Sequence, residues 1–252
     1  MGEVLLQARR VAKAFHGVPA LVDAGLTLRA GEVHVLMGQN GAGKSTLIKI
    51  LAGVQPRDAG EIELGGAPLQ GRTPRELQEA GVAVVHQEVQ LCPNLSVAEN
   101  LLAGHFPKRR PGWLGIDWAK VHREAEVALQ RLGLRLDVCR PLGDCPVAVQ
   151  QLVAIARALH QRARVLILDE PTSSLDDAET ARLLTLLRQL RSEGVAILLV
   201  THFLDQAYAV ADRFTVLRNG GFVGEYSAEL PRMRLVQLMI GRELSASTGA
   251  RD

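Results

Sequence analysis

The stretch GQNGAGKST at residues 38–46 directly follows the apolar run VHVLM at residues 33–37. It fits the pattern G-x-x-x-x-G-K-[S/T], in which a glycine-rich loop joins a buried strand to a helix and cradles nucleotide phosphates. The glycines let backbone amides turn toward phosphate oxygens, and the start of the following helix adds partial positive charge. The stretch therefore predicts an α/β fold that binds a nucleoside triphosphate.

Each position of this loop has an expected contact. Lys44 supplies a point charge to the terminal phosphates, and the Ser45 hydroxyl is placed to bind Mg²⁺. The residues expected to contact the nucleotide are Gly38, Gln39, Asn40, Gly41, Ala42, Gly43, Lys44, Ser45 and Thr46. Kinases, GTPases, motors and transport ATPases all use such a loop, so the loop alone does not name the function.

Short apolar runs rich in β-branched residues recur along the chain outside this loop. Such runs predict strands buried on both faces of a mainly parallel sheet. They occupy residues 33–37, 82–86, 165–169, 195–200 and 213–218. Patterns typical of helices lie between them, at residues 45–53, 176–194 and 203–212. Alternating strands and helices indicate an α/β fold.

Residues 95–160 interrupt this alternation, because they contain helix-like segments and no convincing strand. We interpret them as a helical insertion into the α/β core. The expected organisation is a single domain over residues 1–252. Its core covers about 1–90 and 160–240, its helical subdomain about 91–159, and a loose polar tail about 244–252.

Composition excludes several classes of protein. Apolar residues make up 47% of the 252 residues and the net charge is +2, so the chain is globular and has no concentrated basic surface for nucleic acid. The three cysteines have no metal-binding spacing, and the N-terminus has no signal peptide, which favours the cytosol. The apolar runs are too short to span a bilayer. We expect a soluble chain that can still sit against a membrane protein.

The second half of a nucleotide site is predicted by VLILDEPTSSLD at residues 165–176. Asp169 ends a buried strand and is placed to hold Mg²⁺, directly or through water. Glu170 is placed to orient or deprotonate the attacking water. The alternative is that Glu170 only caps the following turn. The sequence contains no N-K-x-D motif, which argues against a GTPase.

Three further residues are candidates by position. His202 follows a strand at the carboxyl edge of the sheet, where it could contact the γ-phosphate and the attacking water, although a lone histidine is usually structural. Gln87 ends the run VAVVHQ and could sense Mg²⁺ or water. Phe15 could stack on the base. Taken alone, the position of Gln87 or of Phe15 is only weak evidence for a contact with the nucleotide.

Taken together, these motifs resemble the ATP-binding cassette family over nearly the whole chain. Four segments carry the resemblance: the Walker A motif at 38–53, the Q-loop at 84–88, the Walker B motif with the D-loop residue Asp176 at 165–176, and the histidine switch region at 200–220. The resemblance implies a P-loop NTPase cassette with a mainly parallel sheet, an antiparallel β part and an inserted helical subdomain. It also implies ATP and Mg²⁺ as ligands, and a second cassette that closes head to tail on the first.

The family's signature motif, commonly L-S-G-G-Q, precedes a helix that QQLVAIARAL at residues 150–159 resembles. In that family the signature of one cassette contacts the γ-phosphate held by the other. Alignment places the motif at Cys145, Pro146, Val147, Ala148 and Val149, none of which matches the common form. Galactofuranose-importer ATPases, which this segment resembles most, also have Val-Ala in place of Gly-Gly. Pro146 departs even from them.

Pro146 lacks the hydroxyl of the expected serine. A hydroxyl on a phosphate is a charge-assisted hydrogen bond of about 1.5–3 kcal/mol. If that bond belongs to the hydrolysing state, its loss slows turnover about ten- to a hundredfold. The alternative is benign, because proline is favoured at the first position of a helix.

Residues 86–104, 116–134 and 211–225 resemble the first cassette of monosaccharide-importer ATPases of the ribose and galactose type. That implies a transmembrane sugar permease, an indirect link to a solute-binding protein, and a position on the cytoplasmic face of the inner membrane. Those subunits usually carry two cassettes. This chain is therefore a standalone half, a truncated product or a fragment of a longer protein, and its dimer is a homodimer or a heterodimer. The sugar cannot be read.

Two other functions are alternatives to a sugar importer. A soluble cassette ATPase of repair or translation often carries a long insertion, and the compact insertion here favours a transporter. A weakly active regulatory cassette is the other alternative. The presence of Glu170 and His202 argues against a wholly inactive site.

Overall fold

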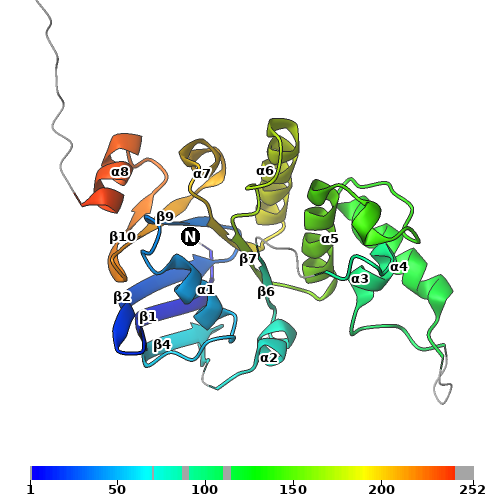
Figure 1. The fold of residues 1–252 in the computed structure, drawn as a ribbon, viewed down its shortest axis with the longest axis horizontal. Coiled ribbons are helices and arrows are strands. Elements are labelled where there is room, and N and C mark those ends of the chain that lie inside the picture. The colour runs from blue at the N-terminus through cyan, green and yellow to red at the C-terminus, as the bar shows by residue number, and fades with distance from the viewer. Residues whose placement is uncertain (1, 70, 87–90, 110–114, 242–252) are drawn as a thin grey trace, which may run out of the picture.

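The computed structural model describes residues 2–69, 71–86, 91–109 and 115–241. Within them, ten strands form one sheet in the order β5-β4-β1-β2-β10-β9-β3-β8-β7-β6 (Figure 1). The family's expected architecture of a mainly parallel core, an antiparallel part and a helical insertion is confirmed.

The parallel part contains the five strands that the sequence predicted. They are β3 (Val33–Met37), β6 (Val82–Val85), β7 (Val165–Asp169), β8 (Ala196–Val200) and β9 (Arg213–Arg218). Each agrees with its predicted range to within one residue at either end. Strand β3 lies between β8 and β9, and β7 lies between β8 and β6, all in parallel register. Their carboxyl ends therefore meet at one edge of the sheet.

The antiparallel part extends the sheet on the side of β9. It consists of β1 (Val4–Phe15), β2 (Val18–Arg29), β4 (Ala59–Leu64) and β5 (Ala67–Pro68). Strand β10 (Gly221–Ser227) runs antiparallel to β9 and pairs with β2 through Gly221 and Asp23. Repeated register shifts between β1 and β2 break the strict two-residue alternation. This explains why sequence periodicity did not locate these two long strands.

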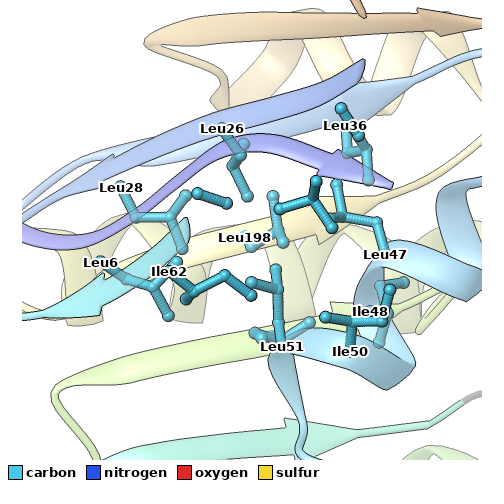
Figure 2. Close-up of a cluster of buried hydrophobic side chains, with 14 of the residues drawn as sticks. Leu6, Leu26, Leu28, Leu36, Leu47, Ile48, Ile50, Leu51, Ile62 and Leu198 are labelled. Atoms are coloured by element: carbon cyan, nitrogen blue, oxygen red, sulfur yellow. The ribbon is translucent and has the colours of Figure 1, made fainter. Parts of the chain in front are cut away.

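One hydrophobic core fixes helix α1 (Lys44–Leu51), which follows the phosphate loop. Figure 2 shows side chains of α1 meeting side chains of the antiparallel strands and of β8. Leu47 and Leu51 of α1 and Leu6 of β1 are almost fully buried. Each such leucine contributes about 1.5–3 kcal/mol through burial. The phosphate loop is therefore attached to a tightly packed helix.

The second core covers the opposite face of the parallel strands. Its helices are α6 (Asp177–Ser192), α7 (Leu204–Val210) and α8 (Arg232–Ile240). Leucines of α6 at positions 183, 187 and 190 are buried against the strands, which matches the spacing of one helix face. With both faces covered, the five parallel strands are fixed in position.

The helical insertion has its own core. It contains α3 (Val97–Leu102), α4 (Trp118–Arg131), the short 3-10 helix η1 (Leu142–Asp144) and α5 (Val147–His160). Helix α2 (Pro74–Glu79) lies apart from it, beside β6 (Figure 1). Within the described part of 95–160, strand-like pairing is limited to two isolated bridges. Helix α5 joins the two regions, because Val153 packs in the insertion core and Ile155 packs under the parallel sheet.

Candidate active site

The phosphate loop runs from β3 into α1 and is pinned by its glycines. Gly43 has a φ of 99°, and a Cβ there would lie 2.5 Å from a methyl carbon of Leu21. A Cβ on Gly38 would lie 2.5 Å from the carbonyl oxygen of Leu217. Only glycine fits these positions between the neighbouring strands. The loop therefore presses closely against β2 and β9.

The outer side of the loop is open. Gln39, Asn40, Gly41 and Ser45 are exposed, whereas Ala42 is buried. The Ala42 amide donates to the Gln39 carbonyl at 3.0 Å, which closes the turn. The exposed residues of the loop lead directly into the N-terminus of α1, an arrangement suited to an anion.

Lys44 lies inside the loop. Its side chain is almost fully buried, and Nζ donates to the carbonyls of Gly38 at 2.8 Å and Gln39 at 3.1 Å. Burial lowers the pKa of the Lys44 ammonium, and the nearby Glu170 and Asp169 carboxylates oppose that shift. The ammonium is thus held within the loop and within electrostatic reach of two acids. Thr46, the third helical residue, is partly buried.

Asp169 and Glu170 follow one another at the end of β7. Burial, followed by the charge of Glu170, raises the pKa of Asp169 above its ordinary value. His86, Lys44 and Lys49 partly counter that shift. A cation beside this pair would favour the ionised carboxylates. The donor set therefore fits a hard divalent cation such as Mg²⁺.

Glu170 has a backbone φ of 48°, which is unusual for a residue other than glycine. Its amide donates to the carbonyl of Val200 in β8 at 2.9 Å, which fixes this conformation. The strained backbone directs the chain sharply away from the strand end. Strain of this kind persists where surrounding structure holds it, and it clusters at functional sites.

His202 lies next to Glu170, although 32 residues separate them in sequence. Its Nδ1 is 3.5 Å from Oε2 of Glu170, and its side chain is half exposed. The ring packs on Phe203 with centroids 4.0 Å apart. The structure thus brings His202 and Glu170 together, and sequence reasoning did not anticipate the supporting Phe203.

His86 is another residue that sequence reasoning missed. It follows β6 at the same sheet edge, and its charge lowers the pKa of Asp169. Its position as the last residue of the predicted strand at 82–86 was the available signal. The neighbouring candidate Gln87 lies outside the described residues.

Two other candidates occupy the ends of elements. Phe15 ends β1 and is partly exposed, with Lys13 Nζ 5.6 Å from its ring centroid. Asp176 is the N-cap of α6, where its carboxylate accepts from the Glu179 amide at 2.7 Å. The D-loop aspartate therefore has a structural task in the single chain.

The signature segment forms a separate place in the fold. Pro146 is the N-cap of α5, one residue before the first helical position that the sequence suggested for it. Its carbonyl accepts from the amides of Val149 at 3.0 Å and Gln150 at 3.1 Å. A proline side chain has no acceptor to cap the helix, and the amides of Val147 and Ala148, the first of α5, have no hydrogen-bond partner among the described residues.

Cys145 is buried in the core of the insertion, whereas Val147 is half exposed. Among the described residues, no hydrogen bond or ion pair links residues 145–149 to the phosphate loop at 38–46. The signature tip is therefore presented outward, away from the chain's own nucleotide loop.

Comparisons with known proteins agree with this geometry. The sequence model of the ABC transporter family matches residues 21–173. The fructose import ATP-binding protein FruK of Bifidobacterium longum (strain NCC 2705) is 53% identical over 230 residues, covering 90% of this chain and 44% of the relative. The galactofuranose transporter ATP-binding protein YtfR of Escherichia coli (strain K12) is 49% identical over 242 residues, covering 95% and 48%. This chain spans about half the length of the curated relatives it matches.

A similar solved structure is the ADP conformation of MJ1267, an ATP-binding cassette of an ABC transporter. It has a TM-score of 0.82 and 26% sequence identity, covering 95% of this chain and 100% of that one. Across the part of this chain that the structure describes, no helix combines the length and apolar character needed to cross a membrane.

Proposed function

This chain belongs to the ABC transporter family, and we propose that it is the ATP-binding and ATP-hydrolysing cassette of a monosaccharide importer. The observation that carries the proposal is one sheet edge where Lys44, Asp169, Glu170 and His202 meet. Relatives named for fructose and galactofuranose import support a sugar as cargo.

ATP is bound by the loop from Gly38 to Thr46, with Phe15 offering a ring to the base. In this proposal, phosphate oxygens accept hydrogen bonds from the loop amides and from the ammonium of Lys44. The carbonyls of Gly38 and Gln39 already hold this ammonium in place. Ser45 and Asp169, together with Gln87 outside the described residues, are proposed as the groups that hold Mg²⁺. When bound, Mg²⁺ neutralises charge on the phosphates.

Hydrolysis depends on Glu170. The Glu170 carboxylate orients the attacking water and accepts a proton from that water. The hydrogen bond from the Glu170 amide to the Val200 carbonyl fixes the backbone that carries the carboxylate. His202 lies 3.5 Å from that carboxylate, where its imidazole would contact the γ-phosphate and the attacking water. The packing of Phe203 against the imidazole limits its orientation.

A second cassette is proposed to complete each site. The signature tip from Pro146 to Val149 lies at the N-terminus of a 14-residue helix whose first amides are uncapped. Those amides and the helix dipole favour an anion, so they suit the γ-phosphate of a partner's ATP. Because Pro146 offers no hydroxyl, we propose a composite site that turns over about ten- to a hundredfold more slowly than one with serine.

The proposed dimer can be a homodimer, in which both composite sites contain Pro146, or a heterodimer, in which only one does. Asp176 of the D-loop then faces the partner while it caps α6. The chain acts as a single cassette over residues 1–252, with the α/β core and the helical subdomain at the boundaries given above.

The sugar permease is proposed to dock beside the Q-loop. A cavity of about 260 Å³ lies between α2, β6 and α5, next to His86. It is lined by residues that include Leu77, Gln78, Val85 and Arg157. An occupant here would touch both the core and the helical insertion. We propose that the cassette lies at the cytoplasmic face of the inner membrane, peripheral through the permease and linked only indirectly to a solute-binding protein.

Reconstitution tests the proposal. The chain is combined in lipid vesicles with the permease and the solute-binding protein that neighbouring genes encode. Uptake of labelled fructose, ribose, galactose and galactofuranose is then measured. ATP-dependent uptake of at least one sugar is expected, with none for Glu170→Gln. ATP hydrolysis that no permease binds or stimulates would instead indicate a soluble cassette ATPase.

A further inference from the structure

Phe15 lies at the exposed tip of the hairpin that β1 and β2 form. His16 and Gly17 make the turn, with backbone φ angles of 50° and 81°, and residues 14–19 are all exposed. Such tips move more than the body of a sheet. An aromatic ring that stacks on a base needs a fixed position, so this tip needs an anchor.

Asp58 makes three contacts with the strand just before this ring. Its amide donates to the carbonyl of Ala12 at 2.9 Å. Its carboxylate accepts from the Ala14 amide at 2.8 Å and from Lys13 Nζ at 2.6 Å. The hydrogen bond from Lys13, followed by that from the Ala14 amide, holds the pKa of Asp58 below its ordinary value. All three residues that precede Phe15 are therefore joined to Asp58.

Lys13 extends this anchor to the ring itself. The lysine is almost fully buried, although the side chain of Asp58 is about half exposed. Lys13 Nζ lies over the Phe15 ring, 5.6 Å from its centroid, where the negative face of the ring attracts an ammonium. One face of the ring is thus occupied, which leaves the opposite face for a base. An ion pair with an exposed partner adds little to stability, so the contact acts mainly through geometry.

The segment that carries Asp58 is itself fixed to the helix of the phosphate loop. The amides of residues 54 and 55 donate to the carbonyl of Lys49 in α1 at 3.0 and 3.1 Å. Arg57 donates to two backbone carbonyls, at 3.0 and 2.8 Å, and so holds the turn around Asp58. A continuous set of hydrogen bonds therefore connects α1 with the strand that ends at Phe15.

We propose that Asp58 is a positioning residue for the base of ATP, because its bonds to residues 12–14 fix Phe15 relative to the phosphate loop. Asp58 does not touch the nucleotide and acts through the ring. The inference rests on the proposed function, in which Phe15 stacks on the base. It extends that function from the ring to the group that holds it.

ATP and inorganic tripolyphosphate separate contacts with the base from contacts with the phosphates. Both are titrated calorimetrically with Mg²⁺ into the full chain in a Glu170→Gln background, so that ATP is not consumed. Asp58→Ala should weaken ATP binding about three- to tenfold and leave tripolyphosphate binding unchanged, because only ATP has a base to stack. Glu61→Ala, which removes an exposed acid of β4, is the matched control and should change neither affinity.

A double-mutant cycle with Phe15→Ala shows whether Asp58 acts through the ring. Phe15→Ala should weaken ATP binding about tenfold, and adding Asp58→Ala should weaken it no further. A merely structural role of Asp58 would weaken both ligands or add to the effect of Phe15→Ala. Either result, or unchanged ATP binding in Asp58→Ala, would overturn the inference.

The same cycle distinguishes this inference from the proposed base contact. Full ATP affinity in Phe15→Ala would overturn the stacking role of Phe15, and the role of Asp58 with it. Weaker ATP binding in Phe15→Ala together with unchanged binding in Asp58→Ala would overturn the role of Asp58 alone.

Discussion

The nucleotide site and the signature tip are the two ends of the proposed catalytic machinery, and the chain fixes them differently. At the nucleotide site, Lys44 is fixed by two carbonyls, Glu170 by the carbonyl of Val200, and His202 by its contact with Glu170. At the signature tip, Pro146 supplies only its carbonyl, and no side chain caps α5. One region is organised within the single chain, and the other is left open.

The difference shows which interactions a single cassette can satisfy by itself. The nucleotide site buries opposite charges within one chain: burial raises the pKa of Asp169 and lowers the pKa of Lys44, and the attraction between the ammonium and the carboxylates opposes both shifts. The signature tip is exposed at Pro146 and Val147, and its N-cap is a proline with no side-chain acceptor for the first amides of α5. In the proposed dimer, a second cassette would bring the phosphate to this tip.

The largest expected effect concerns Glu170, at the organised end. Glu170→Gln keeps the side-chain size but removes the base, so ATP turnover should fall about 10²- to 10⁴-fold while ATP affinity is retained. Steady-state phosphate release and nucleotide titration measure the two quantities. Glu61→Gln, on the exposed side of β4, is the matched control and should behave as wild type. Wild-type turnover in Glu170→Gln would remove this residue from catalysis.

Lys44→Ala should affect binding instead of the chemical step. It removes the only ammonium held inside the loop, so ATP affinity should drop about a hundredfold or more, as expected for lost charge-assisted hydrogen bonds. Lys49→Ala, on the exposed side of the same helix, controls for net charge. Equal ATP affinity in Lys44→Ala and Lys49→Ala would contradict the phosphate-loop assignment.

At the open end, the variant Pro146→Ser/Val147→Gly/Ala148→Gly restores the common signature at three positions. Turnover of the assembled transporter should rise about ten- to a hundredfold, because a hydroxyl and two close-approaching backbone segments are added. ATP affinity measured on the isolated chain should not change. A rise in affinity without a rise in turnover would mean that the segment acts on the chain's own site.

The smallest expected effect concerns the cap of helix α3, which lies away from both the nucleotide site and the signature tip. Ser96 caps α3, donating to Glu99 and accepting from its amide, so Ser96→Ala should cost about 1 kcal/mol of unfolding free energy. Ser192→Ala, at the end of α6, is the control. Urea unfolding measures both variants.

This capping effect should depend on pH with a definite sign. Hydrogen bonds from the Ser96 hydroxyl and amide hold the pKa of Glu99 below its ordinary value. The stabilisation is therefore present above the ordinary pKa of glutamate and is lost as pH falls through the lower folded-state pKa. The difference between wild type and Ser96→Ala should shrink in acid. A difference that grows in acid would contradict this assignment.

Much of the organised end could be predicted from sequence, because local patterns encode it. The pattern from Gly38 to Thr46 needs one strand and one helix, and the five buried strands show as short apolar runs. The placement of His202 near Glu170 followed from the rule that parallel strands present their carboxyl ends at one edge.

Other features depend on long-range contacts that no local pattern encodes. The strands β1 and β2 were missed because bulges break their alternation. The positive φ of Glu170 and its bond to Val200 depend on a neighbouring strand. The buried amide nitrogen of Gln151 has no hydrogen-bond partner among the described residues, and no periodicity in the sequence could reveal this.

In the proposed cassette, a competent nucleotide site is joined to a signature weakened at one residue, Pro146. Pro146→Ser tests it most directly, with Pro146→Ala as the control that removes the proline without adding a hydroxyl. ATP affinity and turnover are measured for both in the assembled transporter. Affinity should be unchanged in both variants, and turnover should rise about ten- to a hundredfold for serine alone. Equal turnover in wild type, Pro146→Ser and Pro146→Ala would contradict it.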